Sequence, residues 1–176
     1  MNYIILSSGE VNLLPFVAES LVMIEKKVKP KLTIGRREKV SFPDLDLTEV
    51  DAKIDTGAYT TALHCKEIQV KQEDGIAVLY FKLLDPSHPE YSEKNQRFEV
   101  FSKKAIKNSS GEAEIRFIIK TRIKIGRKII KTSISLTNRG SMRFPVLIGR
   151  KLLRNRFVVD TDESYLLNSS SNPKNV

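Results

Sequence analysis

The sequence contains few of the residues that most often bind metals or form covalent cross-links. Its 176 residues include one cysteine, two histidines and no tryptophan. A single cysteine excludes an intrachain disulfide, and nothing in the sequence requires an oxidising compartment. The N-terminus has no basic region before its apolar residues, and Glu10 and Glu19 interrupt them, unlike a secretory signal or a membrane span. A cytoplasmic location without membrane association is therefore expected.

The sequence patterns of three common kinds of active site are also missing. A catalytic zinc site usually has two histidines one helical turn apart with a glutamate between them, and His64 and His88 form no such pattern. No Gly-x-x-x-x-Gly-Lys-Ser/Thr loop is present to bind ATP. Cys65 follows His64 directly, and adjacent side chains on a strand point to opposite faces, which disfavours a cysteine nucleophile. We expect no metal and no cofactor, although a zinc site made of His64, Cys65 and a distant acid stays open.

Positive charge predominates in the chain. Thirty Lys and Arg residues against 21 Asp and Glu give a net charge of +9. This balance favours an acidic partner, although basic residues that alternate along predicted strands are also typical of a solvated sheet face. Nucleic acid is disfavoured, because modules that bind it usually expose aromatic side chains for stacking, and aromatic residues make up 7% of this chain.

The most informative stretch follows an apolar strand end at Ile54 and consists of Asp55, Thr56, Gly57 and Ala58. A glycine two positions after an aspartate favours a tight turn, which presents the carboxylate to a cleft rather than burying it in a ladder. A carboxylate that activates water requires such a position, with a hydroxyl group and a glycine beside it. Asp55 is therefore the predicted catalytic residue.

One carboxylate cannot complete this chemistry. Peptide hydrolysis by carboxyl groups needs one that is ionised and one that is protonated. The chain contains one Asp-Thr-Gly, so the second carboxylate would come from another copy across a twofold axis, and a homodimer is predicted. Other aspartates lack a following Thr-Gly or Ser-Gly and are interpreted as turn, cap or surface acids: Asp44, Asp46, Asp51, Asp85, Asp160 and Asp162.

A second stretch, Leu147-Ile148-Gly149-Arg150, carries a resemblance to a known family. In retropepsin-like aspartic proteases, Asp-Thr-Gly-Ala on one loop is followed later by an apolar-apolar-Gly-Arg-x-Leu-Leu segment behind that loop. The chain is most similar to the bacterial family labelled "ATP-dependent zinc protease", whose members resemble retropepsins. Tyr59 departs from the family pattern, which has arginine there. The matching segments lie within residues 34 to 168: 34–38, 52–64, 136–139, 142–144, 157–160 and 164–167.

The resemblance implies an all-β, closed retropepsin-like barrel with a short C-terminal helix, and an aspartic endopeptidase activity. Thr56 would form a hydrogen bond across the twofold axis, and Gly57 would permit close approach. Arg150 would be a structural ion-pair partner, and Arg139 a structural or substrate contact. The family label also suggests a link to ATP-grasp ligases that add glutamates, and hence an acidic or glutamate-rich peptide substrate. A catalytically silent binding module and a zinc-dependent peptidase remain alternatives.

The pattern of apolar residues divides the chain into three parts. Residues 1–31 predict an extension with an amphipathic helix that ends before Pro30, residues 32–168 the peptidase domain, and residues 169–176 a disordered tail. The resemblance implies that residues 98–117 occupy the place of the retropepsin flap. Alternation and turn signals predict these strands in the domain: 39–42, 49–54, 68–70, 76–84, 115–125 and 130–136. Turn signals at Asp74-Gly75 and at Gly126-Arg127 predict that the last four of these strands form two hairpins.

Overall fold

The structure is a computed structural model that describes residues 30–107, 111, 113–140 and 143–167. The chain divides into two units between Pro30 and Lys31, and every strand of the described residues belongs to the second unit. The helix predicted before Pro30 and the tail predicted after residue 168 lie outside the described residues and stay predictions. No helix among the described residues is both long and apolar enough to cross a membrane.

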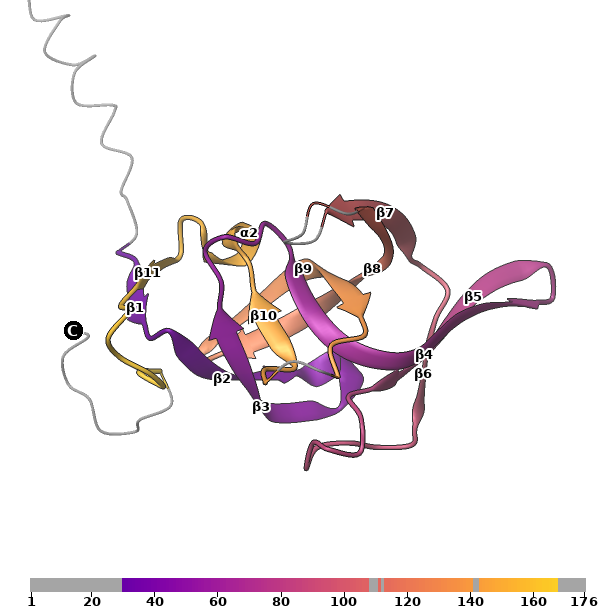
Figure 1. The fold of residues 1–176 in the computed structure, drawn as a ribbon, viewed down its shortest axis with the longest axis horizontal. Coiled ribbons are helices and arrows are strands. Elements are labelled where there is room, and N and C mark those ends of the chain that lie inside the picture. Colours follow the sequence, from indigo (N-terminus) through magenta and orange to yellow (C-terminus); the bar gives the residue numbers. More distant parts are fainter. Residues whose placement is uncertain (1–29, 108–110, 112, 141–142, 168–176) are drawn as a thin grey trace, which may run out of the picture. The chain divides into compact units, whose positions relative to one another are not determined.

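The described part is almost entirely β-structure, which confirms the predicted fold class (Figure 1). Its helical elements are a 3₁₀ turn, η2, and a single α-helical turn, α2, after the last strand of the larger sheet. In chain order the elements are β1 (Leu32–Ile34), β2 (Arg37–Phe42), η2 (Pro43–Leu45), β3 (Leu47–Ile54), β4 (Thr61–Glu73), β5 (Ile76–Leu83), β6 (Asn95–Phe98), β7 (Ser102–Lys107), β8 (Ala113–Ile125), β9 (Lys128–Thr137), β10 (Val146–Ile148), α2 (Arg150–Leu153) and β11 (Phe157–Val159).

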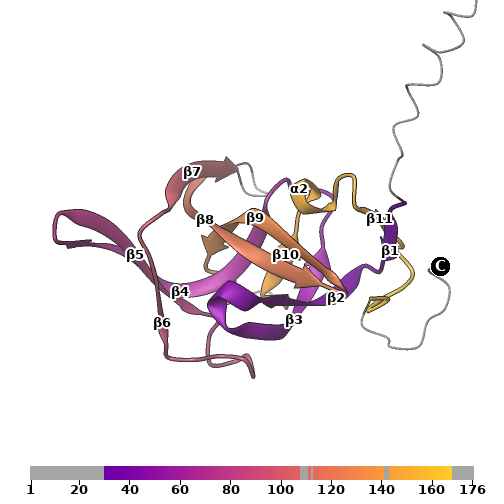
Figure 2. The same ribbon diagram turned by 180° about the vertical axis from the view of Figure 1, so that it is seen from behind.

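The strand pairings form a closed ring. The order along the sheet is β10-β3-β2-β8-β9-β4, and β10 pairs with β4 as well as with β3. The view from behind shows the β8–β9 hairpin on the near side of the body (Figure 2), and β9 lies beside β4 in the ring. Apolar side chains from the ring are fully buried inside it, including Val50, Leu63, Ile123, Ile134 and Ile148. Closure therefore gives each of these strands two neighbours and one shared core.

The two hairpins predicted from turn signals are confirmed. β8 buries Ile119, Thr121, Ile123 and Ile125 on one face and exposes Lys120, Arg122 and Lys124 on the other, as alternation requires, before it turns at Gly126. β4 and β5 meet at Asp74 and Gly75, which both have positive φ, the conformation that Asp-Gly favours in a two-residue hairpin. β4 is longer than the predicted 68–70, because its first half pairs with β9 and β10 before a register shift leads into the hairpin.

A buried carboxylate ties the C-terminal segment to β2. Glu38 is fully buried, and its side chain accepts hydrogen bonds from the N–H groups of Gly35, Leu166 and Leu167. Burial raises the pKa of Glu38, and the three N–H bonds oppose that effect. A Cβ on Gly35 would lie 2.7 Å from the Glu163 carbonyl oxygen, so this contact requires glycine. The segments 34–38 and 164–167 thus lie against each other.

Candidate functional site

Asp55 lies on a turn at the end of β3. Its backbone N–H donates to the carbonyl oxygen of Ile148 at 3.0 Å, which fixes the start of the turn. One carboxylate oxygen, Oδ1, accepts from the N–H of Gly57 at 2.9 Å and from the N–H of Ala58 at 3.1 Å. The side chain is half-buried. The turn therefore orients the carboxylate through Oδ1 and leaves Oδ2 to face other groups.

The segment that contains Leu147 and Ile148 lies directly behind this turn. β10 runs parallel to β3, with Leu147 opposite Lys53 and Ile148 opposite Ile54. Gly149 follows, and a Cβ there would lie 2.7 Å from the carbonyl carbon of Thr60. Glycine is therefore required at this crossing. The two stretches that are far apart in sequence meet here, in the arrangement that the resemblance implied.

Arg150 supports the same turn in a way that differs from expectation. Its Nη1 donates to the carbonyl oxygens of Thr56 and Gly57, both at 2.8 Å, and its backbone N–H donates to the carbonyl oxygen of Ala58 at 2.8 Å. The ion pair that the resemblance implied is not formed with any described acid. The guanidinium instead ties down backbone carbonyls, so Arg150 is a structural contact of the turn.

A cavity of about 890 Å³ opens in front of Asp55. Gly57, Ala58 and Leu147 form part of its wall, and Ile106 closes another side from the β7–β8 hairpin. This hairpin is the segment expected at the flap position, and its strands pair from Ser102 to Lys107 against Ala113 to Ile118. Its contribution to the same cavity agrees with that position.

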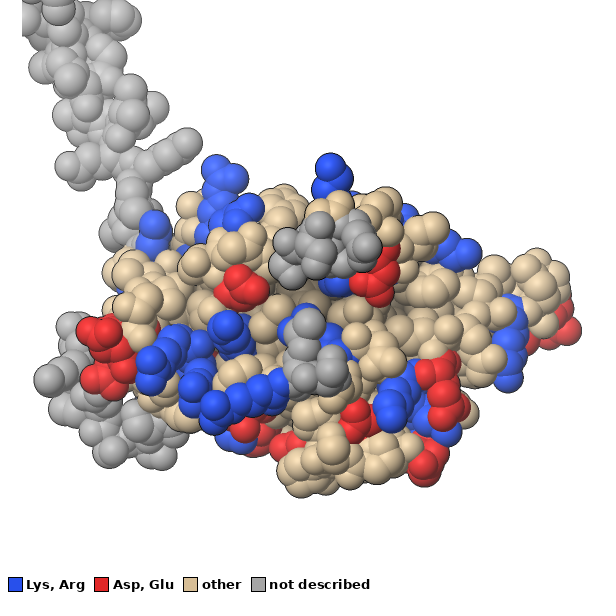
Figure 3. All heavy atoms as spheres, in the orientation of Figure 1, with Lys and Arg blue, Asp and Glu red and all other residues tan. Residues whose placement is uncertain are grey.

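The cavity is strongly basic. Asp55 is the one acidic residue among the described residues that line it. Figure 3 shows Lys and Arg spheres gathered over the part of this face where β2 and β3 lie. Arg116 also forms an ion pair with Glu114 at 2.8 Å, so part of its charge is balanced outside the cavity. The basic lining residues are Lys53, Lys107, Arg116, Arg139 and Arg143.

Arg139 is the most buried of these cations, with 9% of its surface exposed. Burial is the largest cause that lowers its pKa, the positive charge of Arg116 adds to the effect, and the carboxylate of Asp55 opposes it. All three side chains line the same cavity. Tyr59, by contrast, lines the rim with 64% of its surface exposed, and Thr56 is also exposed.

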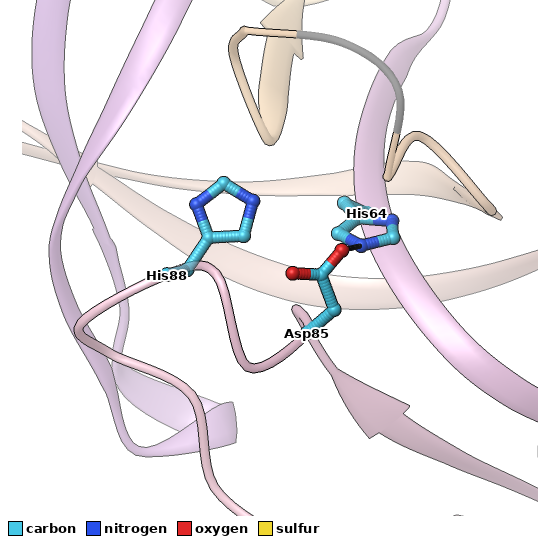
Figure 4. A group of neighbouring side chains, drawn as sticks. All are labelled: His64, Asp85 and His88. Atoms are coloured by element: carbon cyan, nitrogen blue, oxygen red, sulfur yellow. Dashed lines mark hydrogen bonds and ion pairs between the residues drawn. The ribbon is translucent and has the colours of Figure 1, made fainter.

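A second group of polar side chains lies where β4 stops pairing with β9. His64 comes from β4, and Asp85 and His88 come from the loop after β5 (Figure 4). Their candidate ligand atoms lie within 4.8 Å of one another, so the group must be tested as a metal site. In Figure 4 the one marked bond joins His64 to Asp85, and the ring of His88 stands apart.

The hydrogen bonds of His64 do not fit a zinc ligand. Its Nδ1 accepts from the backbone N–H of Arg139 at 2.8 Å, so the proton of the neutral ring is on Nε2, which lies 2.9 Å from Asp85 Oδ2. Zinc at Nε2 would require this proton either to leave the ring, which gives an imidazolate, or to move to Nδ1, where it would oppose the Arg139 N–H. Burial raises the pKa of the Cys65 thiol, which disfavours a thiolate ligand beside His64.

Asp85 and His88 both lie in the loop that follows β5. Asp85 is a turn residue, as expected, because its Oδ1 accepts from the N–H of Ser87 at 2.9 Å. It is not a surface acid, since 5% of it is exposed. Hydrogen bonds from Ser87, and more weakly from His64, lower its pKa well below the usual range. His88 is half-buried with its ring centroid 5.8 Å from that of His64, and is not a fully solvated loop residue.

Some residues around the cavity were not identified from the sequence. Arg116, Lys107 and Lys53 line the cavity beside Asp55, but nothing in their local sequence distinguishes them from solvated strand cations. The His64–Asp85 pair was also missed, although a lone histidine in the apolar strand that follows Asp-Thr-Gly was a usable signal.

Comparisons with known proteins agree with this geometry. The family described as "Retropepsin-like aspartic endopeptidase RimB" matches residues 33–169. A solved structure of Lpg0085, a protein of unknown function from Legionella pneumophila, has a TM-score of 0.56 and 26% identity, and covers 78% of this chain and 99% of that one.

Two curated relatives are named "Probable alpha-L-glutamate ligase". The protein from Desulfotalea psychrophila is 36% identical over 135 residues, which are 74% of this chain and 28% of the relative. The protein from Shewanella pealeana is 32% identical over 141 residues, which are 78% of this chain and 30% of the relative. The chain thus matches less than a third of the length of these relatives. From the family match and the shared fold, the chain belongs to the RimB-like family of retropepsin-like aspartic endopeptidases.

Proposed function

We propose that the chain is an aspartic endopeptidase that acts as a homodimer, with Asp55 of each copy forming a catalytic dyad. The observation that carries this proposal is the placement of Asp55 at a large cavity on a turn backed by Gly149 and Arg150. Two backbone N–H groups hold Oδ1, which leaves Oδ2 to accept a proton from water. Family membership supports the same chemistry.

The need for a second copy follows from the acids around the cavity. No other acidic residue among the described lining residues can serve as the protonated partner of Asp55. Two carboxyl groups held close share one proton, so one activates water while the other donates to the carbonyl oxygen of the peptide bond. Thr56 and Gly57 are exposed on the same turn, where a second copy could reach them. A twofold axis beside this turn would bring the two Asp55 carboxylates together.

Subunit mixing tests the dyad. Asp55→Asn chains mixed in excess with wild-type chains should suppress peptide hydrolysis, because each mixed dimer lacks one ionisable partner. Dilution should also lower the specific activity as dimers dissociate. Arg127→Gln is the matched control for mixing, since its exposed side chain lies at the β8–β9 turn and outside the cavity. Undiminished activity in the Asp55→Asn mixture, or full activity from a proven monomer, would overturn the dyad.

We further propose an acidic, glutamate-rich peptide as the substrate. Five basic side chains line the cavity, against Asp55 alone among the described lining acids. Such a site attracts anionic chains, and salt should weaken the attraction, since the screening length falls to about 10 Å near 0.1 M. Cleavage of a glutamate-rich peptide and its glutamine counterpart should be compared at low and high ionic strength. Equal cleavage rates for the two peptides would mean that the acidity of the peptide does not determine substrate choice.

A functional link to a glutamate ligase completes the proposal. The relatives named "Probable alpha-L-glutamate ligase" contain a region like this chain within a polypeptide about three and a half times as long as the matched region. A ligase that adds glutamates would supply the acidic peptide that this cavity suits. Peptides extended by such a ligase should be cleaved faster than the unextended peptides, and equal cleavage of both would contradict the link.

A further inference from the structure

The backbone of Arg139 is held by a buried pair of side chains outside the cavity. Its N–H donates to His64 Nδ1 at 2.8 Å, and His64 Nε2 lies 2.9 Å from Asp85 Oδ2. His64 is fully buried and Asp85 nearly so. The side chain of Arg139 lines the cavity with Asp55. The three residues thus connect a buried carboxylate to a cation beside the proposed catalytic group.

The protonation of His64 depends on Asp85. A neutral imidazole has one proton, and the Asp85 carboxylate, which accepts but does not donate, keeps that proton on Nε2. Nδ1 is then obliged to be an acceptor, which is what the Arg139 N–H needs. Asp85 Oδ1 is in turn fixed by the N–H and the hydroxyl of Ser87. Each hydrogen bond in the series from Ser87 through Asp85 and His64 to Arg139 therefore has only one possible direction.

The backbone beside Asp85 is consistent with a strictly fixed position. Leu84 is fully buried and has φ of 62°, an uncommon conformation for a bulky residue. Such conformations persist where the surroundings impose them. The Leu84 N–H donates to the carbonyl oxygen of His64 at 3.1 Å, so the strained residue is bound to the strand that carries the histidine. Asp85 Oδ2 also lies against Gly140, where a Cβ would come within 3.0 Å of it.

We infer that His64 and Asp85 are positioning residues that set the substrate preference of the cavity through Arg139. This inference rests on the proposed peptidase function. A guanidinium binds a carboxylate best when its planar fork is held in one orientation, because two parallel hydrogen bonds require fixed geometry. Loss of the His64 acceptor would release the Arg139 backbone, and the guanidinium would then adopt several orientations. The affected quantity is the preference for acidic over neutral peptides, rather than hydrolysis in general.

Two substitutions at His64 separate this role from general packing. The amide oxygen in His64→Asn can take the place of Nδ1 and accept from Arg139, while the longer side chain in His64→Gln reaches the place of Nε2 beside Asp85. Both replace the same buried ring by an amide. We expect His64→Asn to retain most of the preference for a glutamate-rich peptide over its glutamine counterpart, and His64→Gln to reduce it about tenfold through a higher KM, with kcat changed less.

A third variant, Asp85→Asn, tests the proton arrangement. The asparagine amide has a single oxygen, so it can accept from Ser87 or from His64 Nε2 but not from both. Its NH₂ group must then face the other donor. When the NH₂ faces His64, the ring proton moves to Nδ1 and opposes the Arg139 N–H. The preference for acidic peptide should again fall about tenfold. Equal losses in His64→Asn and His64→Gln, or losses that are the same for acidic and neutral peptides, would overturn the inference.

The measurement is arranged so that a failure of the proposed function is recognised separately. Binding of both peptides is measured in the Asp55→Asn background, which needs no hydrolysis, alongside KM and kcat in the active chain. If the wild type cleaves neither peptide, the peptidase function is contradicted. The positioning role still holds if His64→Gln binds the acidic peptide more weakly than the wild type does. If the His64 variants do not fold, imidazole nitrogen NMR of the wild type decides, because a proton on Nδ1 would overturn the inference.

Discussion

Asp55 and Asp85 have the same local structure and different surroundings. Each follows a strand, and each accepts on Oδ1 from the backbone N–H two residues later, at 2.9 Å in both cases. The second oxygen of Asp85 binds His64 in a buried site, whereas Asp55 is half-buried and lines a cavity. The turn alone thus does not decide whether an aspartate is structural or reactive; the group that faces its other oxygen does.

The largest expected effect separates the two aspartates by function. Asp55→Asn should lower peptide hydrolysis by about 10²- to 10⁴-fold, because the amide keeps its shape but cannot accept the proton of water. The free energy of unfolding should change by less than about 1 kcal/mol, since the side chain is only half-buried. Turnover assays and urea unfolding measure both quantities.

Asp85→Asn is the matched control. It should lower the free energy of unfolding by about 1–3 kcal/mol, since a buried donor loses its acceptor. Hydrolysis of a neutral peptide should persist at concentrations where the variant is folded. Loss of all hydrolysis in folded Asp85→Asn, or normal hydrolysis in Asp55→Asn, would remove the distinction between the two sites.

The backing of the Asp55 turn predicts the next effect. Gly149→Ala should destabilise the protein by about 1–3 kcal/mol, because its Cβ would lie within 2.8 Å of two backbone carbonyls, those of Tyr59 and Thr60. Gly75→Ala is the control, with no atom near its Cβ but φ of 78°, so its cost is a local strain of about 1 kcal/mol. Urea unfolding compares them, and only Gly149→Ala should also lower activity.

The two buried carboxyl groups predict opposite responses to pH. The pKa of Asp85 is lowered in the folded state, so its contribution to stability is present above its unfolded pKa of about 3.9 and is lost on acidification. The pKa of Glu38 is raised, so its contribution is full below about 4.3 and falls as pH rises through the folded value. The destabilisation by Asp85→Asn should therefore shrink toward low pH, and that by Glu38→Gln toward high pH. Unfolding curves between pH 3 and 7 measure both trends, and parallel trends would contradict them.

Features encoded by neighbouring residues could be predicted from the sequence. Asp-Gly at residues 74 and 75 predicts its hairpin because both residues adopt positive φ readily, and the apolar alternation of residues 115–125 predicts a two-faced strand. The Asp55 turn and the segment at Gly149 could be identified because each has its own local pattern, and the resemblance joined them.

Features that depend on distant residues could not be predicted in this way. His64 and Asp85 are 21 residues apart, and their contact depends on the buried Leu84, whose positive φ no propensity favours. The pairing of β10 with two strands at once depends on closure of the whole ring. The three-residue β1 pairs with β11, which lies more than 120 residues later in the sequence. The lining cations come from β3, β7, β8 and the loop before β10, so their shared cavity is visible only after folding.

The smallest expected effect compares two arginines that bind backbone carbonyls. Arg150 Nη1 binds Thr56 and Gly57, both at 2.8 Å, and Arg156 Nη1 binds Leu152 and Arg154 at 3.2 and 3.3 Å. A lysine keeps the charge but cannot reproduce the fixed planar fork of donors. Arg150→Lys should therefore loosen the turn that carries Asp55 and lower kcat severalfold, while stability changes by about 1 kcal/mol or less. The bonds of Arg156 are longer and lie away from Asp55, so Arg156→Lys should leave kcat unchanged. Steady-state kinetics decides between them, and equal values of kcat in the two variants would mean that the Asp55 turn is held without Arg150.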